Sequence, residues 1–195
     1  MKRILMTIAA AAMTLLAVHA EEKTLVYDFG EITSIDAGYN YEIHVTEGRS
    51  DKVKVVFDSE VEDLLEVRYS SNGKRLTLFA KNNISQRIRN GRTVPVHVYL
   101  EMRSINTLSL SGAAKADFTG SFKTENLDLD VSGAAGVSGL EIDGITMDAD
   151  CSGAADVYLT GTFMDKVDLD ISGAAKMVYD GDSKALDADV SGASK

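Results

Sequence analysis

The strongest constraint on the fold is a short motif, Ser-Gly-Ala, that occurs five times between Leu108 and Lys195. The serines of the five motifs follow one another at spacings of 21, 20, 20 and 19 residues. They are Ser111, Ser132, Ser152, Ser172 and Ser191. A repeat of nearly constant length indicates that each copy forms the same structural unit and stacks on the copy before it.

Each motif follows a segment in which apolar residues alternate with Asp or Ser. The segment Leu127–Val131 reads Leu-Asp-Leu-Asp-Val, and Val167–Ile171 reads Val-Asp-Leu-Asp-Ile. Alternation with a period of two predicts a β-strand that is buried on one face. Ser-Gly-Ala then predicts a corner, because glycine tolerates the backbone of a sharp turn and alanine allows close approach of neighbouring copies.

A second strand follows each corner, and we expect the glycines Gly120, Gly161 and Gly181 to end it before a third apolar patch. Three short strands and three turns in about 20 residues are typical of one rung of a parallel β-helix. We therefore predict an all-β fold, a right-handed parallel β-helix or β-solenoid with rungs of about 20 residues. The regular part is residues 105–195.

The N-terminus has the pattern of a secretory signal peptide. Lys2 and Arg3 precede an apolar run from Ile4 to Val18, and small residues lie at the expected cleavage point before Glu21. The run is short for a segment that crosses a bilayer. We expect residues 1–20 to be removed after export to the periplasm or cell surface, with residues 21–195 as a single domain.

Charge narrows the classes of partner. The chain has a net charge of −10, which becomes −12 without Lys2 and Arg3. A strongly acidic protein is a poor partner for nucleic acid or for an anionic membrane surface. A protein or a glycan of the cell envelope remains as the expected partner, and we expect no insertion into a membrane after signal cleavage. The single cysteine, Cys151, falls at an inward strand position, which predicts a buried and unreactive thiol.

Residues 21–104 form a less regular half that also alternates. The predicted strands are Leu25–Phe29, Ile32–Asp36, Tyr39–Thr46, Lys52–Phe57, Leu64–Tyr69, Arg75–Ala80 and Val94–Glu101. Asn72-Gly73 predicts a tight hairpin turn between two of them. The polar and basic segment 81–92 predicts a loop. This half is expected to continue the repeats as an irregular cap.

The two halves together resemble a known family. The segments that carry the resemblance are Asp28–Glu47, Lys52–Phe57, Gly73–Leu78 and Val96–Leu100, followed by the Ser-Gly-Ala repeats. This combination resembles the putative auto-transporter adhesin head domain, or GIN domain, of exported Bacteroidetes proteins. The resemblance implies a right-handed parallel β-helix in an exported protein and implies no catalytic residue.

Two columns of aspartates are the main candidate site. If the repeats stack in register, carboxylates in each column lie about 4.8 Å apart. The eight residues are Asp128, Asp130, Asp148, Asp150, Asp168, Asp170, Asp187 and Asp189. Clustered carboxylates suit a hard cation, so weak calcium binding is one interpretation. The other, which we favour, is a solvated face, because no loop has the ligand spacing of a calcium motif. We expect no other cofactor.

The serines, histidines and tyrosines are weaker candidates for a functional site. The motif serines recur, whereas a catalytic serine is singular, so we interpret them as corner residues. His44 and His97 lie on separate predicted strands without the spacing of a metal site. Modest candidates for a contact surface are Tyr39, Tyr41, Tyr158 and the 81–92 loop.

We therefore expect a non-catalytic, adhesin-like binding or interaction module of the cell envelope. The alternative is a carbohydrate-active enzyme of β-helical fold, such as a polysaccharide lyase or glycosidase, which would use carboxylates in an outer cleft. The uniform aspartate columns, without an inserted loop that could build a cleft, favour the binding module.

Overall fold

The computed structural model describes residues 22–81 and 95–195. The predicted signal peptide, residues 1–20, lies outside the described residues, as does the predicted loop beyond Lys81. In the described part, strands and the turns between them make up nearly all of the chain, and the one helical segment is the short 3-10 helix η1 (Ser59–Leu64). The prediction of an all-β protein is confirmed.

The structure describes fourteen strands. In the N-terminal half they are β1 (Glu22–Asp28), β2 (Ser34–Ala37), β3 (Tyr41–Glu47), β4 (Lys52–Asp58), β5 (Leu65–Ser70), β6 (Arg75–Ala80) and β7 (Val96–Met102). In the C-terminal half they are β8 (Thr107–Leu110), β9 (Lys115–Thr119), β10 (Ser121–Lys123), β11 (Asn126–Val131), β12 (Gly136–Cys151), β13 (Asp156–Ile171) and β14 (Lys176–Val190). All seven predicted N-terminal strands are present, with ends that differ by a few residues.

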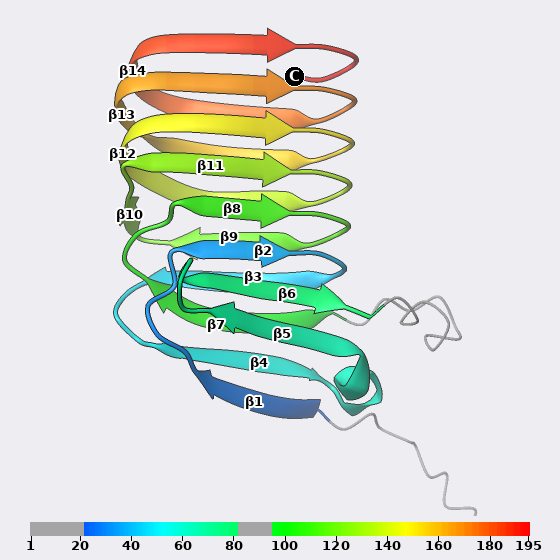
Figure 1. Ribbon diagram of the computed structural model, residues 1–195. Helices are drawn as coiled ribbons and strands as arrows, with labels where there is room; N and C mark the ends of the chain where they lie inside the picture. The colour runs from blue at the N-terminus through cyan, green and yellow to red at the C-terminus, as the bar shows by residue number, and fades with distance from the viewer. Residues whose placement is uncertain (1–21, 82–94) are drawn as a thin grey trace, which may run out of the picture.

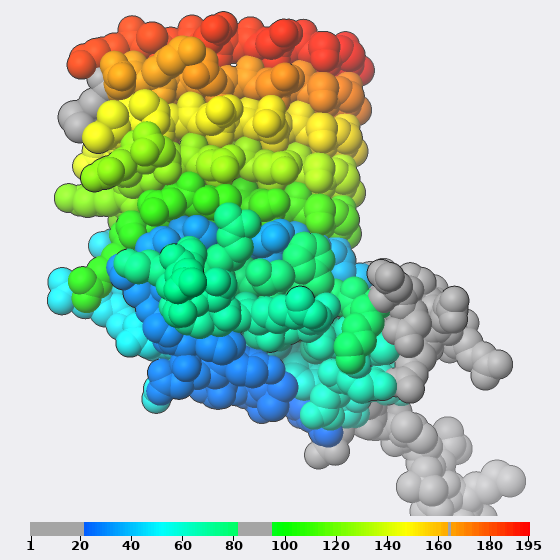
Figure 2. Space-filling model, in the orientation of Figure 1, coloured from blue at the N-terminus to red at the C-terminus, as the bar shows by residue number. Residues whose placement is uncertain are grey.

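The Ser-Gly-Ala repeats stack in parallel and in register, as their spacing predicts (Figure 1). Strands β11, β12, β13 and β14 pair with one another in that order. The corners stack too, because the amide of each motif serine donates to a carbonyl of the copy before: Ser152 N–H to Val131 O and Ser172 N–H to Cys151 O, each at 2.9 Å. Figure 2 shows the copies as even layers.

The prediction of three short strands in each copy is confirmed for the first copy, which has β8, β9 and β10, but is wrong for the later copies. β12 and β13 each run for 16 residues and β14 for 15 without interruption. Gly161 and Gly181, which we expected to end a strand, lie inside β13 and β14 and face each other in register. Neither has a positive φ, and a Cβ on either would meet backbone of the preceding strand. These glycines therefore allow close approach between strands, whereas Gly120 (φ 103) does separate β9 from β10.

The predicted fold class, a right-handed parallel β-helix, is also wrong for this chain. The strands belong to one continuous 14-stranded sheet, which closes around the core as a barrel. The sheet is mixed, because β1 with β4, β4 with β7, and β5 with β6 pair antiparallel. The repeat period fixes the register between successive copies. It carries no information on where a long strand bends, or on the order in which the N-terminal strands join the sheet.

One further copy of the repeat has no Ser-Gly-Ala motif. β2 and β3 pair in parallel with β8 and β9, although about 70 residues separate them in the chain. At the corner, the Ala113 N–H donates to Tyr39 O at 2.7 Å, just as the Ala134 N–H donates to Gly112 O. Tyr39 also takes the left-handed backbone of the motif glycines, with φ 62 against 70 at Gly112. The cap therefore begins with a repeat whose glycine is replaced by tyrosine.

The apolar residues of the alternating strands form one hydrophobic cluster that extends from β2 to β14. Tyr41, Phe122 and Phe163 are the largest fully buried side chains. Outward residues on the same strands are mostly polar, although Tyr99, Tyr158 and Val178 are also exposed. This alternation places the candidate aspartates and the two histidines on the outer face of the sheet, whereas Tyr41 and Cys151 are buried.

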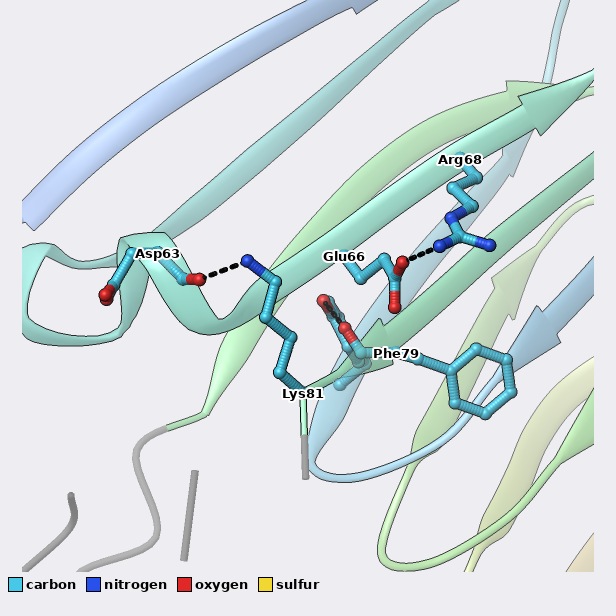
Figure 3. Close-up of polar contacts among 6 residues, drawn as sticks. Asp63, Glu66, Arg68, Phe79 and Lys81 are labelled. Atoms are coloured by element: carbon cyan, nitrogen blue, oxygen red, sulfur yellow. Dashed lines mark hydrogen bonds and ion pairs between the residues drawn. The ribbon is translucent and has the colours of Figure 1, made fainter. Parts of the chain in front are cut away.

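β5 and β6 form the predicted hairpin, and Figure 3 shows the polar contacts around the end of β6 that lies away from the turn. The residue with positive φ is Lys74 (φ 45), not the predicted Asn-Gly pair. Lys81, at the end of β6, donates from Nζ to the carbonyl of Asp63 in η1 at 2.7 Å, and Tyr41 donates from its hydroxyl to Phe79 O at 3.0 Å. These contacts fasten the hairpin to η1 and to β3.

Candidate functional site

The eight predicted aspartates lie together on the outer face of β11–β14 and are called here the acidic ladder. Asp128, Asp148, Asp168 and Asp187 are successive cross-strand neighbours, and so are Asp130, Asp150, Asp170 and Asp189. All are exposed except Asp168, which is partly exposed. The predicted arrangement in two columns is therefore present. Whether a cation binds to it stays a prediction.

The carboxylates of the acidic ladder disfavour one another's charge. Burial raises the pKa of Asp150, and the neighbouring charges of Asp148 and Asp170 raise it further. The second column continues into the cap through Ser109 to Asp36, whose pKa is also raised, mainly by burial. Backbone pairing holds these carboxylates one strand spacing apart, whereas charges placed at random on a surface could move away from one another.

One lysine partly compensates the acidic ladder. Lys166 Nζ lies 2.6 Å from Asp168 Oδ1, and this ion pair raises the pKa of Lys166. A hollow of about 260 Å³ lies near the C-terminal end of the ladder. Its lining consists of Asp148, Asp168, Leu169, Asp170, Asp187 and Asp189. The volume suits a hydrated ion rather than a sugar chain.

A larger concavity, which we call the corner groove, lies where the chain turns from β10 into β11. It has a volume of about 750 Å³, within the range of ligand pockets. Its lining residues are Ser104, Asn106, Thr107, Lys123, Thr124, Glu125, Asn126, Asp128, Asp143, Gly144 and Ile145. The groove thus offers hydroxyl, amide, carboxylate and ammonium groups beside one exposed aliphatic side chain.

The groove is built by irregularity in the otherwise regular sheet. The register between β12 and β13 shifts between Gly144 and Thr146, and such bulges often lie beside functional sites. Hydrogen bonds fix its wall: Thr146 donates from Oγ1 to Asn126 Oδ1 at 2.6 Å, and Thr124 donates to Asn106 Oδ1 at 3.4 Å. Our sequence reasoning missed this groove. The signal that could have found it is an asparagine at or just before the start of the strand in two successive repeats: Asn106 is five residues before Ser111, and Asn126 is six residues before Ser132.

A third polar cluster contains the histidines. His44 on β3 and His97 on β7 lie on adjacent strands with their rings stacked, the ring centroids 5.8 Å apart, and Glu42 lies beside them. The sequence shows no metal-site spacing for these histidines, but the structure brings them together with Glu42. Spacing in the sequence did not reveal the cluster because 53 positions separate the two residues, and only the pairing of β3 with β7 brings them together.

The minor candidates have mixed outcomes. Tyr41 is fully buried, so it offers no contact surface, whereas Tyr158 is 40% exposed with Lys176 over its ring. Tyr39 is partly buried, and its hydroxyl lacks a hydrogen-bond partner among the described residues. Cys151 is buried as predicted, and burial raises its thiol pKa to about 11, which keeps it protonated and inert.

Residues 31–195 match the family model described as "Putative auto-transporter adhesin, head GIN domain". The chain belongs to this family. The resemblance of the sequence to the adhesin-head GIN family is thereby confirmed over residues 31–195.

Two solved structures support the same fold for this GIN-family chain. A putative adhesin from Parabacteroides distasonis shares 13% identity, with a TM-score of 0.66 over 88% of this chain and 70% of that one. A putative adhesin from Bacteroides fragilis shares 18% identity, with a TM-score of 0.55 over 90% of this chain and 96% of that one. No curated protein matches the chain in sequence. Among the described residues, no helix is long and apolar enough to span a membrane.

Proposed function

We propose that this GIN-domain protein is an exported, non-catalytic binding module of the cell envelope, and that the corner groove holds a neutral glycan. Membership of an adhesin-head family supports the adhesin-like role. The observation that supports a glycan as the ligand is the lining of the corner groove, which is rich in hydroxyl and amide groups. Such groups donate to and accept from the hydroxyls of a sugar.

Charge supports a neutral ligand rather than an acidic one. Glu125, Asp128 and Asp143 lie in the groove, with Lys123 as its one basic lining residue. A polyanionic chain would meet these carboxylates and the overall net charge of −10. A neutral glycan avoids this repulsion, and its hydroxyls can donate to the same carboxylates.

The test is binding of neutral and acidic envelope polysaccharides, measured by calorimetry. We expect neutral glycans to be retained without release of reducing ends or unsaturated sugars. Asn126→Ala removes a wall amide and should weaken binding about 2- to 12-fold, the equivalent of one hydrogen bond of about 0.5–1.5 kcal/mol. Asn72→Ala, in the exposed β5–β6 turn, is the matched control and should bind as the parent does.

Other outcomes point elsewhere. Release of reducing ends or unsaturated sugars would support the carbohydrate-active enzyme, with the groove carboxylates in the acid–base roles. If the chain bound an envelope protein and no glycan, the proposed ligand class would be wrong and the partner would be a protein. Export itself is tested by fractionation of native cells with surface proteolysis, which separates a periplasmic from a surface location.

A further inference from the structure

Glu42, His44 and His97 form a compact cluster on the outer face of β3 and β7. Their ligand atoms, one from each residue, all lie within 4.8 Å of one another. Glu42 is the direct cross-strand neighbour of His97, and His44 follows two positions along β3 on the same face. The alternating residues Tyr41 and Ile43 point into the core, which holds the three polar side chains outward.

The cluster has unused coordinating capacity. His97 Nδ1 is inaccessible to solvent and makes no hydrogen bond among the described residues. It lies 3.3 Å from Glu42 Oε2, the distance of an ion pair without hydrogen-bond geometry. A buried nitrogen without a partner is costly in a protein, and a metal ion that accepts its lone pair removes this cost.

We propose that Glu42, His44 and His97 bind one divalent transition-metal ion, with zinc as the reference metal. Two imidazoles and one carboxylate suit zinc, nickel or copper, whereas calcium and magnesium take oxygen ligands. Three protein ligands leave at least one coordination position open to solvent or to a partner. The site is separate from the acidic ladder on β11–β14 and from the corner groove.

The geometry requires only a small closure. Bonds of about 2.1 Å in a tetrahedral site separate ligand atoms by about 3.4 Å. Ligand atoms within 4.8 Å of one another must therefore approach by no more than about 1.4 Å. The side chains of His97, His44 and Glu42 are each about one-third exposed, so rotation about their χ angles can supply this movement while the strands stay paired.

The neighbours orient the cluster. Asp117 Oδ2 on β9 lies 3.9 Å from His44 Nδ1. A small rotation of the carboxylate would let it accept the imidazole N–H and leave the other nitrogen for the metal. The Tyr99 ring stacks on His44 with centroids 4.8 Å apart. Lys54, 5.5 Å from the Tyr99 centroid, and Lys115, the cross-strand neighbour of Glu42, are the nearby cations that oppose binding. Their charge predicts moderate rather than extreme affinity.

The experiment uses the exported protein, purified without a polyhistidine tag and freed of metal by chelation. Isothermal titration with zinc should give one site per chain, and bound cobalt should give the visible absorption of imidazole coordination. His44→Gln and His97→Gln should each weaken zinc binding by at least about tenfold, since even the loss of a group that only hydrogen-bonds to a metal ligand has that effect. Asp170→Asn, in the acidic ladder, is the control for unspecific binding to carboxylates and should leave the site intact.

Thermal melting of each metal-free variant shows whether it remains folded, and Glu42→Gln provides a second variant that keeps both rings. Asn126→Ala in the corner groove should bind zinc normally, so this result is independent of glycan binding. Failure of a molar excess of zinc to bind, or unchanged binding by a folded variant that lacks both histidines, would overturn the proposal. If Asp170→Asn lost as much zinc binding as the histidine variants, the metal would bind at the acidic ladder, and the proposal would be overturned as well.

Discussion

Val131 and Val190 occupy the same position in two copies of the repeat, yet Val131 is fully buried and Val190 is 52% exposed. Between them in the same column, Cys151 and Ile171 are also buried. The column thus ends in solvent, because β14 is paired on one side only in the described sheet. Burial of a repeat residue therefore depends on the presence of a copy on each side.

This contrast predicts unequal effects of the same substitution. Val131→Ala removes buried methyl groups and leaves a cavity, so it should lower the free energy of unfolding by about 2–3 kcal/mol. Val190→Ala should cost less than about 1 kcal/mol, because much of its side chain already contacts water. Urea denaturation of both variants measures the difference. Equal losses would show that β14 is covered in solution.

Corner glycines should be intolerant of a side chain. Gly153 has φ 74, and a Cβ there would lie 2.7 Å from the carbonyl oxygen of Gly133 in the copy before. Gly153→Ala should therefore destabilise the protein by more than about 1 kcal/mol, since it combines an unfavourable backbone with a backbone clash.

Gly136 is the matched control. It has no positive φ, and a Cβ there would meet its nearest atom, Asp156 O, at an ordinary 3.5 Å. Gly136→Ala should leave stability unchanged or slightly raised, because alanine reduces the entropy of the unfolded chain. Thermal melting of the Gly153→Ala and Gly136→Ala variants measures the difference. Equal destabilisation would show that the corners stack less closely than the structure indicates.

Local alternation predicted the strands, and the repeat period predicted their register. The inward positions of Leu127, Leu129 and Val131 follow from polar neighbours on either side, and all three are buried. The sequence did not reveal the course of the sheet. Gly161 is a residue type typical of turns, but it lies in a continuous strand. Its lack of a side chain allows close approach to the neighbouring strand and does not mark a change of direction.

The candidate sites divide in the same way. The acidic ladder follows from a pattern within each repeat, so it was predictable residue by residue. The pairing of His97 with Glu42 arises from the association of β3 with β7, whose first residues, Tyr41 and Val96, lie 55 positions apart in the sequence. No local pattern encodes that association. The corner groove likewise depends on a bulge whose position only the three-dimensional register defines.

Partial burial of Asp150, together with repulsion from its neighbours in the acidic ladder, makes stability depend on pH. The pKa of Asp150 is raised in the folded protein, so the native state binds more protons than the unfolded state just above the ordinary aspartate pKa of about 4. Stability contributed by this group therefore falls as the pH rises through that window. Asp150→Asn should raise the free energy of unfolding at pH 7, by less than about 1 kcal/mol for so exposed a group.

The gain should vanish near pH 3, where the parent carboxyl is protonated in both states, and it should shrink in high salt, which screens the repulsion. Glu141→Gln is the control on the same strand, because Glu141 is exposed and its cross-strand neighbours are Ser121 and Thr160. Denaturant titrations at pH 3 and pH 7 measure both variants. A gain for Asp150→Asn that persists at pH 3 would rule out the charge of Asp150, whether through burial or through repulsion, as its cause.

Calcium distinguishes the two interpretations of the acidic ladder. The solvated face is favoured because no loop has the ligand spacing of a calcium motif and because Lys166 forms an ion pair with Asp168. It predicts that millimolar calcium raises the melting temperature no more than magnesium does at equal ionic strength. A binding face predicts a rise specific to calcium, because bound cation stabilises the native state by mass action. That rise should be lost in a variant with Asp150→Asn and Asp170→Asn together, and retained in Glu141→Gln. A calcium-specific rise with this pattern would replace the solvated face by a cation site on β12 and β13.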